Sequence, residues 1–163
     1  MRNPYLLPPI AVHTDRWSCK QPLFEVAGHS LIWHPLCAIA KVPSIREVIL
    51  IGYYDESVFA PSIRRWCAEF PALKITYLRE YVALGTAGGL YHFRDAILMG
   101  NPKRIFVLNS DVCCSFPLKE MLELFEEKEA EAVLLGTKVQ VEAAQRFGCR
   151  HPPVTTPLPV ELS

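Results

Sequence analysis

Short apolar runs alternate with longer amphipathic segments along most of the chain. Four runs rich in β-branched or apolar residues predict buried strands, and they cover residues 48–51, 74–78, 104–108 and 132–135. Four other segments predict helices, with ends given to within about 2–4 residues, and they cover 31–41, 57–69, 88–99 and 117–129. Because such alternation is typical of βαβ units, the pattern predicts an α/β fold with a mostly parallel sheet and flanking helices.

Individual residues predict where these helices begin and which faces they bury. Ser30 is placed to cap the first helix, and Pro35 would either kink that helix or shift its start. Asp55 opens a polar turn before the second helix. The helix over 117–129 has its apolar residues on one face and its glutamates outside that face, which is typical of a solvated surface helix. The acidic run therefore requires no partner.

Both ends of the chain are rich in proline, which removes backbone donors. Residues 1–20 contain Pro4, Pro8 and Pro9 with little periodicity, which predicts an irregular arm. Residues 150–163 contain four further prolines, which predict a disordered tail. The folded domain is therefore expected over residues 21–149.

Composition narrows the classes of function. Half of the residues are hydrophobic (50%), and 17 basic residues balance 17 acidic ones. A chain without net charge has no global field that attracts nucleic acid or anionic membrane, so neither is an expected partner. The apolar runs are far shorter than the roughly 18 residues of a membrane-spanning helix. No secretory leader is recognisable, and the six cysteines are expected to stay reduced in the cytoplasm.

Two loops that follow predicted strands have candidate chemistry, because ligands of open parallel sheets bind beyond the carboxyl ends of the strands. The first loop, 84–89 (LGTAGG), lets backbone amides approach a ligand and leads into a helix N-terminus that favours anionic groups. It matches neither GxGxxG nor the P-loop pattern. Equally, its glycines could serve only a tight turn and close helix packing.

The second loop is Asn109-Ser110-Asp111, directly after the strand 104–108. A carboxylate at the tip of a buried strand is suited to hold Mg²⁺ near a bound phosphate. The alternative is an Asx turn, in which Asn109 or Asp111 bonds its own backbone.

The remaining reactive residues form no recognisable site. Cys113-Cys114 has no CxxC partner, and the five histidines lack zinc-ligand spacing. No GxSxG sequence is present, which disfavours a hydrolase.

Five stretches carry a family resemblance: QPLFEVAG (21–28), EVILIGYY (47–54), YLREYVALGTAGGLYHFRDAI (77–97), VLNSDVCCSFPL (107–118) and RFGC (146–149). Together they resemble the sugar-phosphate nucleotidyltransferases, and within them the mannose-1-phosphate guanylyltransferases. The resemblance covers about residues 21–149. The form GGLYHF is nearer the alpha-type subunits, which in some species are regarded as regulatory.

The resemblance implies a Rossmann-like nucleotidyltransferase domain that, with Mg²⁺, joins GTP and mannose 1-phosphate to give GDP-mannose and pyrophosphate. It implies that Asp111 holds Mg²⁺ and that Gly148 touches the sugar. Five residues would contact the guanine base through backbone groups: Leu84, Gly85, Thr86, Ala87 and Gly88. No catalytic protein residue is implied, because the sugar phosphate itself attacks the α-phosphate and the protein positions the reactants.

The chain departs from the family pattern at both ends. The family begins with a buried strand and a GGxGTRxxPL loop, whereas residues 1–19 here contain no such loop, and Gln21 stands in place of a family lysine. After Cys149 the later metal carboxylate, the VEKP lysine motif and the carboxy-terminal β-helix have no counterpart. Residues 6–12 are apolar enough for a substitute first strand, but the nearby prolines argue against a central position. We therefore expect an incomplete domain without its central strand.

Three interpretations of function stay open. The first is a guanylyltransferase-like protein of GDP-mannose biosynthesis that is inactive alone, with GTP or GDP-mannose and mannose 1-phosphate as its ligands. The second is a non-catalytic regulatory subunit that senses GDP-mannose and binds a catalytic guanylyltransferase subunit. The third is a truncated product without function.

Overall fold

The computed structural model describes residues 9–14, 23–82, 84–112 and 114–137. The chain divides into two compact units, Met1–Leu118 and Lys119–Ser163, which are described separately. Within the described residues, no helix is long and apolar enough to cross a membrane.

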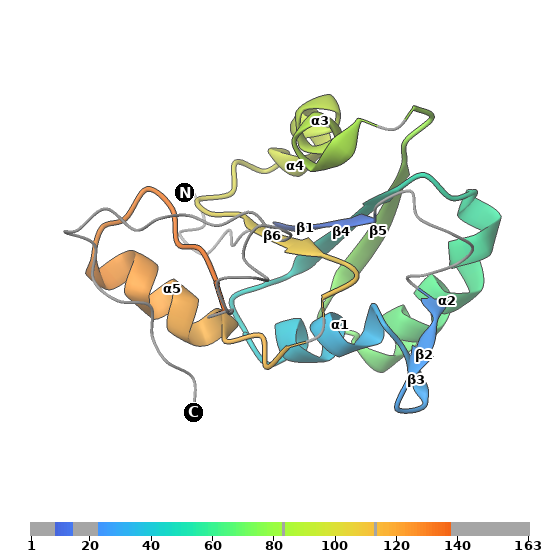
Figure 1. Cartoon of the computed structure of the whole chain (residues 1–163), viewed down its shortest axis with the longest axis horizontal. Helices are drawn as coiled ribbons and strands as arrows, with labels where there is room; N and C mark the ends of the chain where they lie inside the picture. The colour runs from blue at the N-terminus through green and yellow to red at the C-terminus, as the bar shows by residue number, and fades with distance from the viewer. Residues whose placement is uncertain (1–8, 15–22, 83, 113, 138–163) are drawn as a thin grey trace, which may run out of the picture. The chain divides into compact units, whose positions relative to one another are not determined.

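Four parallel strands form the main sheet of the first unit (Figure 1). Their spatial order is β5-β4-β1-β6, and their bounds are β1 (Pro9–Thr14), β4 (Glu47–Gly52), β5 (Lys74–Arg79) and β6 (Phe106–Asn109). Ile10 of β1 is in register with Val48 of β4 on one side and with Phe106 of β6 on the other. The strand β1 therefore lies inside the sheet.

The central position of β1 corrects the expectation of an incomplete sheet. Pro4 and Pro8 precede the strand, and Pro9 is its first residue, where a missing N–H is tolerated. The five residues that follow, IAVHT, all have a backbone donor. The expectation that proline excludes a central strand is therefore wrong for residues 9–14. The prolines lie before the strand or at its first residue, and none lies in its interior. The domain boundary at residue 21 stays a prediction.

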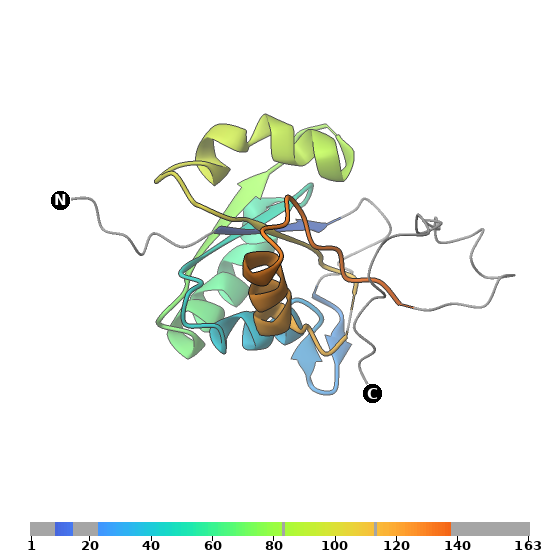
Figure 2. The same ribbon diagram turned by 90° about the vertical axis from the view of Figure 1, so that its left-hand side faces the viewer.

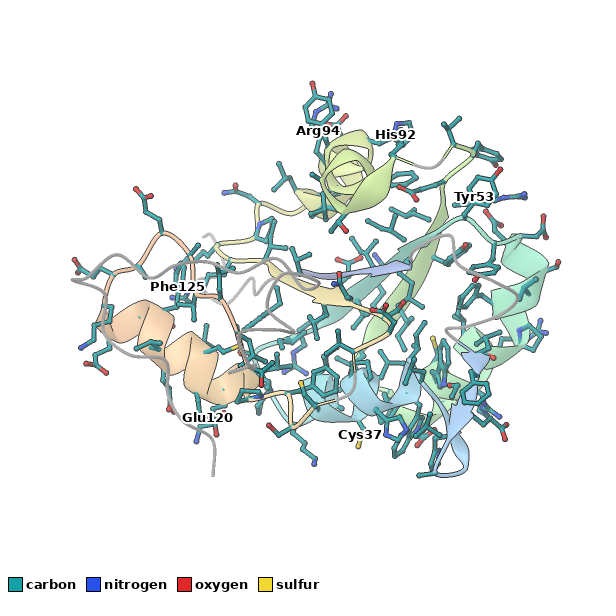
Figure 3. The ribbon with its side chains drawn as sticks, in the orientation of Figure 1. Cys37, Tyr53, His92, Arg94, Glu120 and Phe125 are labelled. Carbon is teal, nitrogen blue, oxygen red and sulfur yellow. The ribbon has the colours of Figure 1, made fainter. Side chains whose placement is uncertain are left out.

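Helices cover both faces of the sheet (Figures 1 and 2). On one face lie α1 (Trp33–Ala40) and α2 (Glu56–Glu69), and on the other lie α3 (Gly85–His92) and α4 (Arg94–Ile97). Figure 3 shows the same two layers with their side chains. Cys37 of α1 lies on one side of the sheet, and His92 and Arg94 lie on the other.

The strand β4 supplies both hydrophobic cores by alternation of its side chains. Val48 and Leu50 belong to the larger core, which includes the buried Phe59 and Trp66 of α2. Ile49 and Ile51 form a smaller core with Ile97 of α4. All four strand residues are at most 3% exposed, so β4 is buried on both faces, as expected of an inner parallel strand.

Most predicted elements are confirmed, but two local predictions are wrong. Ser30 does not cap α1: it lies in β3 (His29–Ser30), which pairs with β2 (Glu25–Val26), and Ile32 occupies the N-cap position. The hairpin turn between these strands uses positive φ at Ala27 (52°) and Gly28 (80°). Pro35 lies in the first turn of α1, where its missing donor costs no helical hydrogen bond.

The predicted strand over 132–135 does not form. These residues have no regular secondary structure, and Leu134 is 70% exposed. A strand needs a neighbouring edge to satisfy its backbone groups, and a local apolar run does not specify that edge. The preceding helix α5 (Leu118–Glu127) does form, with exposed glutamates and a Lys119–Glu123 pair at 3.6 Å, as expected of a solvated helix.

Candidate functional site

The carboxyl ends of the four parallel strands lie along one edge of the sheet. From β1 the chain passes to β4 and then β5 on one side, and it crosses back to β6 on the other side of β1. The order of strands therefore reverses between β1 and β6, which is where open α/β sheets bind ligands. Both candidate loops follow strands of this sheet: 84–89 follows β5, and Asn109–Asp111 follows β6.

The glycine segment is helical rather than a loop. Leu84 is the N-cap of α3, and the helix begins at Gly85 instead of near residue 88. Gly85 has φ +69°, a conformation that side chains rarely adopt. A Cβ on Gly88 would lie 2.8 Å from the Cβ of Leu84, so this position requires glycine for close approach. Turn geometry and packing thus account for both glycines, while contact of residues 84–88 with a base stays a prediction.

Charged and aromatic groups brace the end of β5 just before this helix. The Arg79 guanidinium lies 2.5 Å from an Asp55 carboxylate oxygen, and the Tyr77 hydroxyl donates to the carbonyl of Tyr54 at 2.8 Å. The backbone N–H of Glu80 donates to the carbonyl of Gly52 at 2.8 Å, and the Glu80 side chain is almost fully buried. The carboxyl ends of β4 and β5 are therefore joined by side chains as well as by the sheet.

The electrostatics of this brace favour a charged Asp55 and a neutral Tyr77. Hydrogen bonds from the Ser57 hydroxyl and backbone N–H lower the pKa of Asp55, and the Arg79 charge lowers it further. Burial raises the pKa of Tyr77 well above its usual value. Sequence reasoning placed Asp55 in a polar turn but missed its partner Arg79 and missed Tyr77; the signal for Arg79 was a polar residue at the end of an apolar strand.

The second candidate loop places Asp111 in solvent beside a buried serine. Asn109 is the last residue of β6, Ser110 is 3% exposed, and Asp111 is exposed. The chain then returns to the larger core at Phe116, which is 9% exposed and has φ +48°. Phe116 therefore anchors the far end of the segment that includes Asp111.

Asp111 is a single exposed carboxylate, so a metal bound to it would need further ligands from outside this side chain. No group of three or more histidine, cysteine or acidic side chains suited to a metal occurs in the described part of the chain. Mg²⁺ commonly takes one or two carboxylates, keeps several waters and completes its shell with substrate phosphates. A solvent-exposed carboxylate at the strand edge suits that arrangement.

The two candidate loops follow strands whose carboxyl ends lie at the same edge of the sheet. They follow the outermost strands β5 and β6, which are separated by β4 and β1. At about 4.8 Å between neighbouring strands, the strand ends are roughly 14 Å apart. Gly148 lies outside the described residues.

Comparisons with known proteins identify the family of this chain. The profile of the nucleotidyl transferase family matches residues 17–153, and the chain belongs to that family. A protein of Schizosaccharomyces pombe named as a probable mannose-1-phosphate guanyltransferase is 51% identical over 130 residues, which are 79% of this chain and 31% of that protein.

Two further relatives are named mannose-1-phosphate guanylyltransferase regulatory subunit alpha. The protein from Dictyostelium discoideum is 42% identical over 127 residues, and the human protein is 43% identical over 129 residues. These alignments cover 78% and 79% of this chain, and the chain spans 31% of the length of each relative. The predicted α/β nucleotidyltransferase fold and the family resemblance are thus confirmed.

Among solved structures, the crystal structure of 4-diphosphocytidyl-2C-methyl-D-erythritol synthase is similar with a TM-score of 0.49 and 14% identity. The similarity covers 74% of this chain and 54% of that chain.

Proposed function

We propose that this chain is a guanylyltransferase-like protein of GDP-mannose metabolism that binds GDP-mannose or GTP along the carboxyl edge of its sheet. The observation that carries this proposal is the central position of β1. With β1 in place, the sheet continues from β5 to β6 and holds the glycine segment and Asp111 on one edge. Family membership and the relatives' names supply the class of ligand.

Within this proposal, each loop serves one part of the nucleotide sugar. Backbone groups of residues 84–88 contact the guanine base, and Asp111 holds Mg²⁺ against the phosphates. When bound, the Mg²⁺ would neutralise charge on the phosphates during attack by mannose 1-phosphate. Gly148 is proposed to touch the sugar. The residues hold and orient the reactants, since the reaction needs no protein nucleophile.

We propose recognition without turnover by this chain alone. The GGxGTR-type loop is absent from the sequence, and Gln21 brings no charge where the family has a lysine. Fewer cations therefore oppose the charge that develops on the transferred phosphate. A second candidate, a regulatory subunit, is favoured by the names of the two alpha-subunit relatives and by the GGLYHF sequence. Its partner would be a catalytic guanylyltransferase subunit.

A cytoplasmic location belongs to the same proposal. The described cysteines Cys37, Cys67 and Cys114 are free thiols, which fits a reducing compartment.

Calorimetric titration of the purified chain with GDP-mannose tests the proposal. We expect saturable binding that strengthens with Mg²⁺, and we expect Asp111→Asn to remove the effect of Mg²⁺ while leaving weaker binding in its absence. No binding to the folded chain would contradict the proposal. Co-purification with a catalytic guanylyltransferase, together with altered feedback inhibition of that enzyme, would favour the regulatory function.

A further inference from the structure

Tyr81 stands out as an exposed aromatic ring that is held in place. It lies two residues after the end of β5 and three residues before Leu84, the N-cap of α3. The residue is 75% exposed, yet the guanidinium carbon of Arg79 lies 5.1 Å from its ring centroid. One face of the ring is thus covered by a cation, and most of the remaining surface is open to solvent.

The Arg79 guanidinium that contacts Tyr81 is itself held by the start of α2. Arg79 pairs with Asp55 at 2.5 Å. Asp55 is the N-cap of α2 and accepts hydrogen bonds from the backbone and hydroxyl of Ser57 at 3.0 and 2.6 Å. A chain of contacts therefore runs from the start of α2 through Arg79 to Tyr81. Such preorganisation reduces the entropy lost when a ligand binds.

From these contacts we infer that Tyr81 is the stacking surface for the base of the bound nucleotide, with Arg79 and Asp55 as positioning residues. This inference rests on the proposed function, because it assumes a nucleotide at the carboxyl edge. A purine offers a flat π-face, which stacks on aromatic side chains largely regardless of base identity. Tyr81 supplies such a face immediately before the glycine segment, and hydrogen bonds from backbone groups of that segment would then select the base.

Tyr91 provides a matched control within the same helical layer. It is 71% exposed, and the guanidinium carbon of Arg94 lies 4.6 Å from its ring centroid. Arg94, however, donates only to the nearby Tyr91 carbonyl at 3.0 Å and lies 3.8 Å from Asp95. Tyr91 is the last but one residue of α3, whereas Tyr81 precedes that helix. Tyr81 and Tyr91 are therefore matched in exposure and in their contact with an arginine, and they differ in position.

The test is calorimetric titration of GDP-mannose, with Mg²⁺, into the full chain and its variants. Tyr81→Ala is expected to raise the Kd roughly 5- to 150-fold, the range for loss of one base-stacking aromatic. Tyr81→Phe keeps the ring and should restore binding to within about twofold. Arg79→Gln, which removes the supporting cation, should raise the Kd roughly two- to fivefold. Tyr91→Ala should bind like the parent chain.

The outcomes separate this inference from the proposed function. Equal binding by the parent chain and Tyr81→Ala would overturn the inference and leave the proposed function standing. Equal losses in Tyr81→Ala and Tyr91→Ala would also overturn it, because position would then not matter. Absence of binding by the parent chain would overturn both. Thermal melts of each variant establish that a loss of binding is not a loss of fold, since both tyrosines are exposed.

Discussion

The two loops at the carboxyl edge differ in how the fold supports them. The segment after β5 is braced by the Arg79–Asp55 ion pair and by the bond from Glu80 to Gly52, and it continues directly into α3. The segment after β6 is held at its ends, by buried Ser110 and by Phe116, and it leaves Asp111 in solvent. The first loop is therefore organised before any ligand arrives, whereas the second offers one carboxylate that a metal and a phosphate would complete.

Among substitutions in or beside these two segments, removal of the Phe116 anchor should have the largest effect on stability. Phe116→Ala deletes a buried aromatic from the larger core and keeps the residue at its positive φ, so we expect a loss of about 3–5 kcal/mol in unfolding free energy. Urea denaturation measures this loss. Phe24→Ala is the matched control, because Phe24 is 67% exposed and its removal should change stability by less than about 0.5 kcal/mol. Similar losses in both variants would contradict the anchor.

Gly88→Ala should destabilise the chain, although alanine is the better helix former. The intrinsic gain of about 1 kcal/mol is opposed by overpacking of the new Cβ against Leu84, which costs about 1–3 kcal/mol, so a net loss of roughly 1 kcal/mol is expected. Gly136→Ala is the control, since nothing lies within 4 Å of a Cβ built there. If Gly88→Ala had a higher Tm than the parent chain, the space beside Leu84 would be large enough for the added Cβ.

The pH dependence of stability should report on the Asp55 brace. Its pKa is lower in the folded chain than in the unfolded chain, so its contribution is present at neutral pH and is lost as the pH falls through the acidic range of an Asp carboxyl. Asp55→Asn should therefore lower the Tm at pH 7 and leave a smaller difference at acid pH. If the difference in Tm between Asp55→Asn and the parent chain were the same at neutral and acid pH, the charge of Asp55 would not contribute to stability.

Asp111→Asn should have the smallest effect on stability. An exposed loop side chain contributes little to the fold, so the unfolding free energy should stay within about 0.5 kcal/mol of the parent value. Its effect should be confined to Mg²⁺-dependent binding. A large loss of stability would mean that Asp111 serves the turn itself, as the Asx-turn alternative supposes.

The sequence predicts elements that have strong local signals better than elements that depend on their neighbours. Strands β4 and β5 and helix α2 follow from apolar runs and from the polar turn at Asp55, which are local signals. That Asp55 caps α2 was not predicted. A substitute strand over residues 6–12 was considered but not expected to be central, and a strand was wrongly predicted over 132–135, because pairing depends on which neighbour is available. The glycine and Asp111 loops were located by motif, whereas the support of Tyr81 by Arg79 and Asp55 needs the fold, because Arg79 and Asp55 are far apart in the sequence.

Thermal unfolding of the whole chain, with and without GDP-mannose and Mg²⁺, tests the central claim that β1 completes a sheet whose edge binds a nucleotide sugar. We expect a cooperative transition that moves to higher temperature with ligand, because a ligand that binds only the folded state stabilises it. Val12→Pro, which breaks β1 between Leu50 and Leu108, should abolish that transition. A non-cooperative melt of the parent chain would show that β1 does not complete a stable sheet. A midpoint that does not change with ligand would show that the sheet does not bind the nucleotide sugar.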